Sequence, residues 1–120
     1  MTETLQTEQI IACAFKVSNT LGCGFLEKVY ENALAHELNK SGLPCEQQAS
    51  IDVRYDGVIV GQYFADILVD RQVILEIKVV KNIIGVHEAQ TLNYLKATGL
   101  KTALVLNFAS SRVEVRRFVL

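Results

Sequence analysis

The sequence predicts an α/β domain in which helices cover both sides of a mixed sheet. Apolar residues recur at helical spacing over the first 40 positions, alternate at strand spacing next, and then return to helical spacing before two final strands. The expected core order is therefore α-β-β-β-α-β, with an extra strand at the C-terminus. The chain has 120 residues, one proline and no repeat, so we expect a single domain over residues 1–120.

Two helices, or one helix broken at glycines, are expected at the start of the chain. Residues 6–20 and residues 26–40 both carry apolar side chains at helical spacing. Gly22 and Gly24 interrupt this pattern between the two segments.

Three strands are expected next. Residues 51–55 alternate between apolar and polar side chains, and Asp56-Gly57 predicts a tight hairpin turn. The return strand runs over residues 58–69. Residues 73–80, VILEIKVV, are apolar enough for a central strand that is covered on both faces.

A third helix and two strands complete the expected order. Residues 86–98 have helical spacing and are followed by Gly99, a typical residue at a helix end. TALVLNF and RVEVRRFV then read as strands, joined at Ser110-Ser111.

The composition excludes several classes of protein. No apolar run approaches the roughly 18 residues needed to span a bilayer, and MTETLQTEQI lacks the pattern of a secretory signal, so we expect a cytoplasmic protein without a membrane partner. The three cysteines have no CxxC spacing and predict neither a disulfide framework nor a zinc site. The net charge of −1 argues against a basic DNA-binding module, so affinity for nucleic acid would need local clustering, a bound cation or a partner.

Three ionisable residues form the candidate site. Glu76 and Lys78 are two positions apart on the central strand, so their side chains leave the same face. A carboxylate and an ammonium on a buried strand are costly unless something uses them. Asp66 lies on the preceding strand and could join them on one face of a hairpin.

The turn between these strands decides whether Asp66 reaches that face. A three-residue loop, Asp70 to Gln72, places Asp66 directly across from Glu76. A two-residue loop would turn the Asp66 carboxylate to the wrong face, although such loops are commoner in general. We therefore predict an odd-length turn or a bulge here.

The two carboxylates suggest metal-assisted chemistry. Carboxylates brought together repel one another, and a divalent cation relieves that repulsion. Magnesium prefers a few carboxylate oxygens plus water and substrate phosphate, and metal-bound water is a stronger nucleophile near neutral pH. Lys78 could then orient the water or stabilise developing negative charge. A structural ion pair at a solvated sheet edge is the alternative, because ExK triplets are common by chance.

Two helical pairs add to this set. Glu27 and Glu31 are four apart on the second expected helix, a spacing that brings like charges together and is usually explained by a solvated face. Gln90 and Tyr94 are four apart on the third expected helix and share a face, which alone indicates packing more often than function.

The order of these features resembles a known superfamily. Asp66, then Glu76-x-Lys78, then Gln90-x-x-x-Tyr94 resembles the PD-(D/E)XK nucleases, in particular the branch with a QxxxY helix. GFLEKVY, residues 24–30, is similar to the signature of the GxxExxY family within that superfamily, and so is VHEAQTLNYLKATGLK.

The resemblance implies a restriction-endonuclease-like fold and a metal-dependent nuclease. It implies that Asp66 and Glu76 bind Mg²⁺ or Mn²⁺ and that Lys78 is catalytic. Ala65 stands where the superfamily's name has a proline, at a position that varies in such proteins. The implied partner is nucleic acid, with DNA as the first expectation.

The helical residues receive roles in the same way. Glu27 would be the helix carboxylate that supports the metal site, with Glu31 as a less favoured substitute. Gln90 and Tyr94 would orient the catalytic lysine or a substrate phosphate.

Two alternatives stay open at the level of sequence. The first is a catalytically silent nucleic-acid- or protein-binding module of the same fold, which the low net charge and small size favour. The second is a subunit that is active only as a homodimer or with a partner protein.

Overall fold

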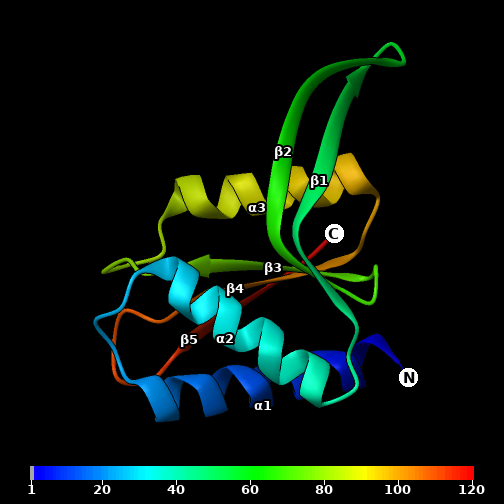
Figure 1. Ribbon diagram of the computed structural model, residues 1–120. Helices are drawn as coiled ribbons and strands as arrows, with labels where there is room; N and C mark the ends of the chain where they lie inside the picture. Colours follow the sequence, from blue (N-terminus) through cyan, green and yellow to red (C-terminus); the bar gives the residue numbers. More distant parts are fainter. Residues whose placement is uncertain (1) are drawn as a thin grey trace.

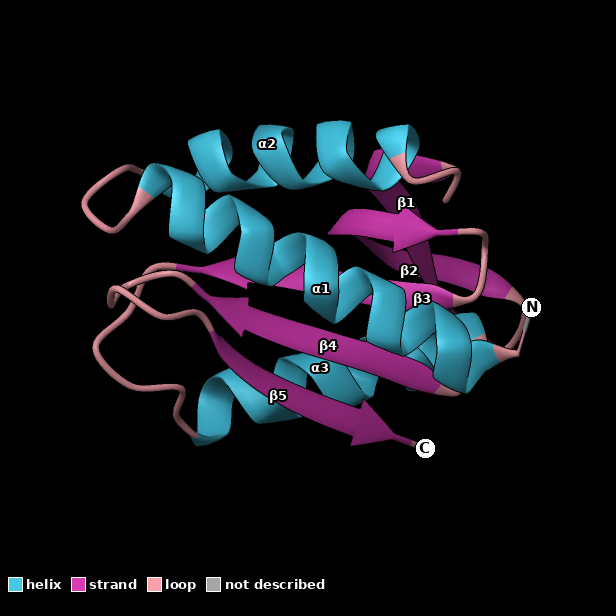
Figure 2. Ribbon diagram, turned by 90° about the horizontal axis from the view of Figure 1, so that it is seen from below, coloured by secondary structure: helices cyan, strands magenta, loops and turns pink. Residues whose placement is uncertain are grey.

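A five-stranded mixed sheet lies between two helices on one face and one helix on the other (Figures 1 and 2). The computed structural model describes residues 2–120. Its elements are α1 (Glu3–Leu21), α2 (Glu27–Lys40), β1 (Cys45–Tyr55), β2 (Val58–Val69), β3 (Val73–Lys78), α3 (Gly85–Thr98), β4 (Thr102–Asn107) and β5 (Glu114–Val119). The strands follow the order β1-β2-β3-β4-β5, and only β3 and β4 pair in parallel. The predicted fold class and element order are confirmed.

The glycines after α1 separate the first two helices, as predicted. Gly24 has a φ of +112°, which favours glycine, so the chain can reverse there. Tyr30 of α2 fixes this loop, because its hydroxyl donates to the Gly22 carbonyl at 2.7 Å and accepts from the Phe25 N–H at 3.2 Å. The Tyr30 ring is fully buried and stacks on Phe108 at 4.7 Å between centroids. The loop is therefore tied to the core under α1 and α2.

The two faces of the sheet have separate cores. The larger core contains the inward side chains of α1 and α2 together with Leu75 and Ile77 of β3. The smaller core joins Tyr94 and Leu95 of α3 to Ile74 and neighbouring small residues. Alternation along β3 therefore directs its even-numbered side chains toward α3.

The β1–β2 hairpin extends beyond the sheet and past α3 (Figure 1). Its tip is the predicted two-residue turn, in which Asp56 and Gly57 have φ values of +53° and +76°. The predicted start of β1 at Ile51 is wrong, because the strand begins at Cys45. Its first half, CEQQAS, lacks apolar alternation because it is an edge strand whose polar side chains reach α2.

No helix in the described part of the chain, residues 2–120, combines the length and the apolar character needed to cross a bilayer.

Candidate active site

The register between β2 and β3 places Asp66 beside Glu76. The two strands pair from Val69–Val73 to Ile67–Leu75, across the three-residue loop of residues 70–72. Asp66 and Glu76 are the next residues beyond this ladder, and the charge of Asp66 acts on Glu76. The predicted odd-length turn is therefore confirmed.

Asp66 also marks the point where β2 separates from β3. Its Oδ2 atom accepts the Ile77 N–H at 2.7 Å, in place of a backbone carbonyl of β2. Ala65 packs under α3, whereas Ile67 packs under α1 and α2, although regular alternation would place both on one face. The strand thus twists at Asp66, where its pairing with β3 has ended.

The side chains of β1 also change face, at Gln48 beside Asp66. Gln48 lies between the pairs Gln47–Ile67 and Ala49–Ala65 and has a φ of +54°. Figure 1 shows the two strands crossing as they leave the sheet. This shared twist carries the hairpin over α3 and turns the Gln48 side chain toward Asp66, with Nε2 3.5 Å from Oδ1.

Glu76 is a buried carboxyl group with an unsatisfied oxygen. The residue is 4% exposed, and within residues 2–120 its Oε1 atom has no hydrogen-bond partner. Burial raises its pKa from the usual 4.5 to about 9, and the charge of Asp66 acts in the same direction, while Lys78 opposes both. A bound cation would favour the ionised form and supply the missing partner. Asp66 and Glu76 therefore fit a divalent metal.

Lys78 is the last residue of β3 and is partly exposed. It shares the face of Glu76, and no ion pair or hydrogen bond occupies its ammonium within residues 2–120. Asn107 of the neighbouring strand holds the chain just after it, since its amide donates to the Val80 carbonyl at 2.8 Å and accepts the Val80 N–H at 3.1 Å. This clamp fixes the end of β3 and hence the base of the Lys78 side chain.

Tyr94 approaches the carboxylates from α3. The residue is 6% exposed. Burial, followed by the negative charges of Glu76 and Asp66, raises its pKa to about 12, whereas a hydrogen bond from Gln90 has the opposite effect. Its hydroxyl is therefore a neutral donor near the two acids. Tyr94 thus lies near the two acids with Gln90 beside it, while the expected role of this pair in orienting Lys78 or a phosphate stays a prediction.

Residues 4–118 match the PD-(D/E)XK nuclease superfamily. This chain belongs to that superfamily. PD-(D/E)XK nucleases generally use divalent metals, which agrees with the donor set of Asp66 and Glu76.

The solved structure described as "Crystal structure of SSO0001" has the same fold, with a TM-score of 0.56 at 18% sequence identity. The match covers 98% of this chain and 59% of that chain, so this chain spans less than two thirds of its length. At this level of identity the likeness shows the fold alone. No protein with a curated functional description matches the sequence significantly.

Glu31 is the carboxylate of α2 that the structure links to Asp66. It is 4% exposed, and its oxygens accept from Gln48 at 3.0 Å, Gln47 at 2.7 Å and Lys28 at 3.0 Å. The Gln48 amide also reaches Asp66, so it bridges the two acids.

Glu27, by contrast, is exposed on the first turn of α2. No hydrogen bond or ion pair joins it to another residue of the described chain, and its negative charge suits the helix N-terminus. Its expected role at the metal stays a prediction.

No three Asp, Glu, His or Cys side chains within residues 2–120 are grouped closely enough to hold a metal ion. The site therefore offers two carboxylates that meet, Asp66 and Glu76, and a third, Glu31, that is linked through an amide. Magnesium is often bound by one or two carboxylates together with water, so a pair of acids suffices for it.

Two residues that the sequence analysis did not identify help to build this site. Gln48 connects Glu31 with Asp66, and Asn107 clamps the chain after Lys78. A glutamine or asparagine carries no local signal of such a role. Only the QQ pair before the predicted strand could have suggested polar side chains directed at a neighbouring helix.

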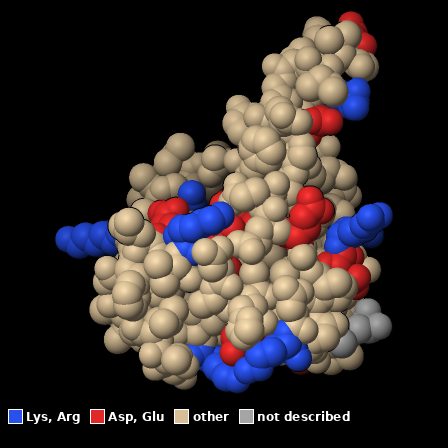
Figure 3. Space-filling model, in the orientation of Figure 1, with Lys and Arg blue, Asp and Glu red and all other residues tan. Residues whose placement is uncertain are grey.

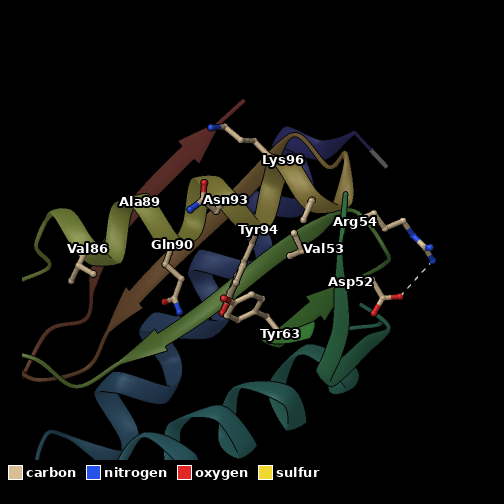
Figure 4. Close-up of a pocket in the computed structure, with 11 residues that line it drawn as sticks. Asp52, Val53, Arg54, Tyr63, Val86, Ala89, Gln90, Asn93, Tyr94 and Lys96 are labelled. Atoms are coloured by element: carbon tan, nitrogen blue, oxygen red, sulfur yellow. Dashed lines mark ion pairs between the residues drawn. The ribbon is translucent and has the colours of Figure 1, made fainter. Parts of the chain in front are cut away.

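A cavity of about 730 Å³ adjoins these residues between the hairpin and α3 (Figure 4). Gln90 and Tyr94 line it, together with Tyr63 and Val53 from the hairpin. Tyr94 therefore borders the cavity and also lies near the two carboxylates.

Proposed function

We propose that this chain is a nuclease that hydrolyses nucleic-acid phosphodiester bonds with Mg²⁺ or Mn²⁺. One observation carries the proposal: Glu76 buries a carboxyl oxygen that has no partner among residues 2–120, directly beside a second acid, Asp66. Such an arrangement destabilises the folded protein, so it is explained best by a ligand that needs both acids.

Asp66 and Glu76 would hold the metal. Asp66 is fixed by the Ile77 N–H through Oδ2, which leaves Oδ1 facing Gln48 and the site. Glu76 would release its proton when the cation binds, since metal ligands must be deprotonated. A bound cation would supply a water of lowered pKa and would neutralise charge on the scissile phosphate.

Lys78 would act on the reacting phosphate. Its ammonium leaves the same face as Glu76 and is not engaged in an ion pair within residues 2–120. It can stabilise negative charge that develops on a phosphate oxygen or hold a water in place. Tyr94 and Gln90 can donate hydrogen bonds from α3 to orient the lysine or a phosphate.

We also propose membership of the GxxExxY family. In the segment Gly24–Tyr30, Gly24 provides the reversal and Tyr30 fixes the loop to the core, so both ends of the motif have a structural role here. Glu27 is the motif position whose role the geometry leaves unexplained.

Nucleic acid, with DNA as the first choice, is the proposed substrate. Figure 3 shows acidic and basic side chains mixed over one face, and the net charge is −1. Attraction of the phosphate backbone would therefore depend on the bound cation and on Lys78 more than on a general basic surface.

Cleavage of a panel of single- and double-stranded DNA and RNA with Mg²⁺ or Mn²⁺ tests the proposal. Lys78→Ala should reduce cleavage by at least about 100-fold, as loss of a charge-stabilising group typically does. Lys40→Ala, which removes an exposed lysine paired with Glu37, is the matched control and should cleave normally. Equal cleavage by wild type and Lys78→Ala would show that the activity does not come from this site.

A catalytically silent binding module is the second candidate. The absence of a three-ligand group within residues 2–120 and the low net charge favour it. Thermal unfolding with and without Mg²⁺ separates the two functions. A silent module should show no Mg²⁺-dependent stabilisation that disappears in Asp66→Ala.

A homodimer or a partner protein remains part of the proposal. The hairpin tip exposes four large apolar side chains, Tyr55, Val58, Ile59 and Val60. Exposed apolar groups that cluster in this way mark interaction sites in many proteins. Mass measurement in solution, paired with the cleavage assay, tests whether activity follows an assembled form.

A further inference from the structure

The cavity between the hairpin and α3 has two unlike walls. The hairpin contributes Tyr63 and Val53, and α3 contributes Ala89 and Ala97, whose small side chains leave space along the helix. At about 730 Å³ the cavity is as large as typical small-molecule sites, which span roughly 300–1,000 Å³.

Tyr63 offers an aromatic surface inside this cavity. The residue is 50% exposed, and its backbone is fixed by pairing with Ile51 of β1. Its ring lies against Tyr94, with 5.7 Å between centroids and an angle of 46° (Figure 4). One part of the ring is thus supported while the rest stays open to a ligand.

The polar groups of the cavity suit a nucleotide. Asn93 and Lys96 of α3 both line it and are exposed, and neither has a side-chain hydrogen bond or ion pair within residues 2–120. An amide can pair with the donor and acceptor groups of a base edge, and an ammonium can contact a phosphate. On the hairpin, a guanidinium nitrogen of Arg54 lies 3.9 Å from a carboxylate oxygen of Asp52, so these two charges largely balance each other.

The cavity adjoins the candidate active site through Tyr94. Gln90 and Tyr94 line it, and the charges of Glu76 and Asp66 act on the Tyr94 hydroxyl. A nucleotide whose base occupied the cavity would therefore have its phosphate next to the residues proposed to cleave it.

We propose that this cavity is a base-binding subsite, in which one unpaired nucleobase stacks on Tyr63, so that the preferred substrate is single-stranded nucleic acid. The inference rests on the proposed nuclease function. A base within a duplex is already stacked and paired, so its face is not available to an aromatic side chain. An unpaired base can enter, because every base has a face that stacks on an aromatic ring.

Binding of a short fluorescein-labelled single-stranded oligonucleotide, followed by anisotropy in EDTA, tests this subsite. Stacking on an aromatic residue contributes enough that Tyr63→Ala should weaken binding by about tenfold or more. Tyr63→Phe keeps the ring and should bind within about twofold of wild type. Tyr55→Ala is the matched control, because Tyr55 is a more exposed tyrosine at the tip of the same hairpin, outside the cavity.

Tyrosine fluorescence gives a second readout. The chain contains four tyrosines and no tryptophan, so quenching by a stacked base is not masked by tryptophan emission. Wild-type emission should fall when the oligonucleotide binds. In Tyr63→Phe this quenching should shrink while the affinity is kept, a result that a purely structural role for Tyr63 would not produce.

The outcomes separate this inference from the proposed function. If Tyr63→Ala binds as tightly as wild type, or if a blunt duplex binds as tightly as the single strand, the base subsite is wrong, and Mg²⁺-dependent cleavage by the same protein would leave the nuclease function standing. If wild type neither binds nor cleaves any oligonucleotide with Mg²⁺ or Mn²⁺, the nuclease function and the subsite both fail. Circular dichroism and thermal unfolding of each variant confirm that it is folded.

Discussion

Replacing Glu76 by glutamine removes the ionisable group and nearly preserves the side-chain shape. In the wild type, the pKa of Glu76 is about 9 in the folded protein and near its usual 4.5 in the unfolded chain. Between these values the unfolded chain releases a proton that the folded protein retains, so the wild type loses stability as pH rises. Glu76→Gln carries no such proton and should not show this loss.

The size of the effect follows from the pKa difference. Each pH unit within this window lowers the free energy of unfolding by about 1.4 kcal/mol for one group. From about pH 5 to about pH 8, the wild type should therefore lose about 4 kcal/mol relative to Glu76→Gln. A typical domain has only about 5–15 kcal/mol of total stability, so the change is large enough to measure.

Urea unfolding in EDTA, followed by circular dichroism at several pH values, measures this difference. The variant should match the wild type near pH 5 and exceed it increasingly toward pH 8. Comparison of the two proteins isolates the contribution of Glu76. Glu46→Gln replaces an exposed glutamate at the start of β1 and should parallel the wild type at every pH. A constant difference between Glu76→Gln and wild type across the pH range would refute the reasoning about burial.

Three further outcomes are expected. Mg²⁺ or Mn²⁺ should raise the unfolding temperature, more strongly as pH rises toward 9 because Glu76 must lose its proton to bind the metal, and Asp66→Asn should abolish this rise. Calorimetric titration in buffers of different ionisation enthalpy measures the proton release, and a metal affinity that does not depend on pH would contradict the prediction. In kinetic assays, Glu31→Gln should lower the rate of metal-dependent cleavage by about tenfold or more, while the rate of Glu27→Gln should stay within about twofold of wild type. A larger loss in Glu27→Gln would show that Glu27, and not Glu31, is the helix carboxylate that supports the metal site. Tyr30→Phe should lower the free energy of unfolding by about 1–3 kcal/mol in urea titration, because the Gly22 carbonyl and the Phe25 N–H both lose their hydrogen-bond partner. Unchanged stability would mean that water replaces the hydroxyl.

Local sequence features were sufficient for much of the framework. Asp56-Gly57 predicts its own turn, because the left-handed backbone of both residues suits that dipeptide. The glycines after residue 21 predict the break between α1 and α2 for the same reason. The ten-residue spacing of Asp66 and Glu76 predicts a three-residue loop, since side chains alternate strictly along a strand, and the observed register agrees.

The environment of the site could not be predicted in this way. Glu27 and Glu31 share a helix face, but one turn of helix separates them by about 6 Å along its axis. Only the position of α2 over the sheet determines that Glu31 reaches Gln48 while Glu27 stays exposed. Local patterns describe a helix and its faces, whereas the offset between helix and sheet depends on packing of the whole core.

The sequence by itself determined the types of element, the tight Asp56-Gly57 turn and the odd-length loop between the strands of the two acids, because these depend on neighbouring residues. The tertiary structure decided which acid is buried, which amide links the acids and where the cavity opens. Glu76 owes its raised pKa to the loss of water beneath α3 and to the charge of Asp66, and both arise only when distant segments pack together.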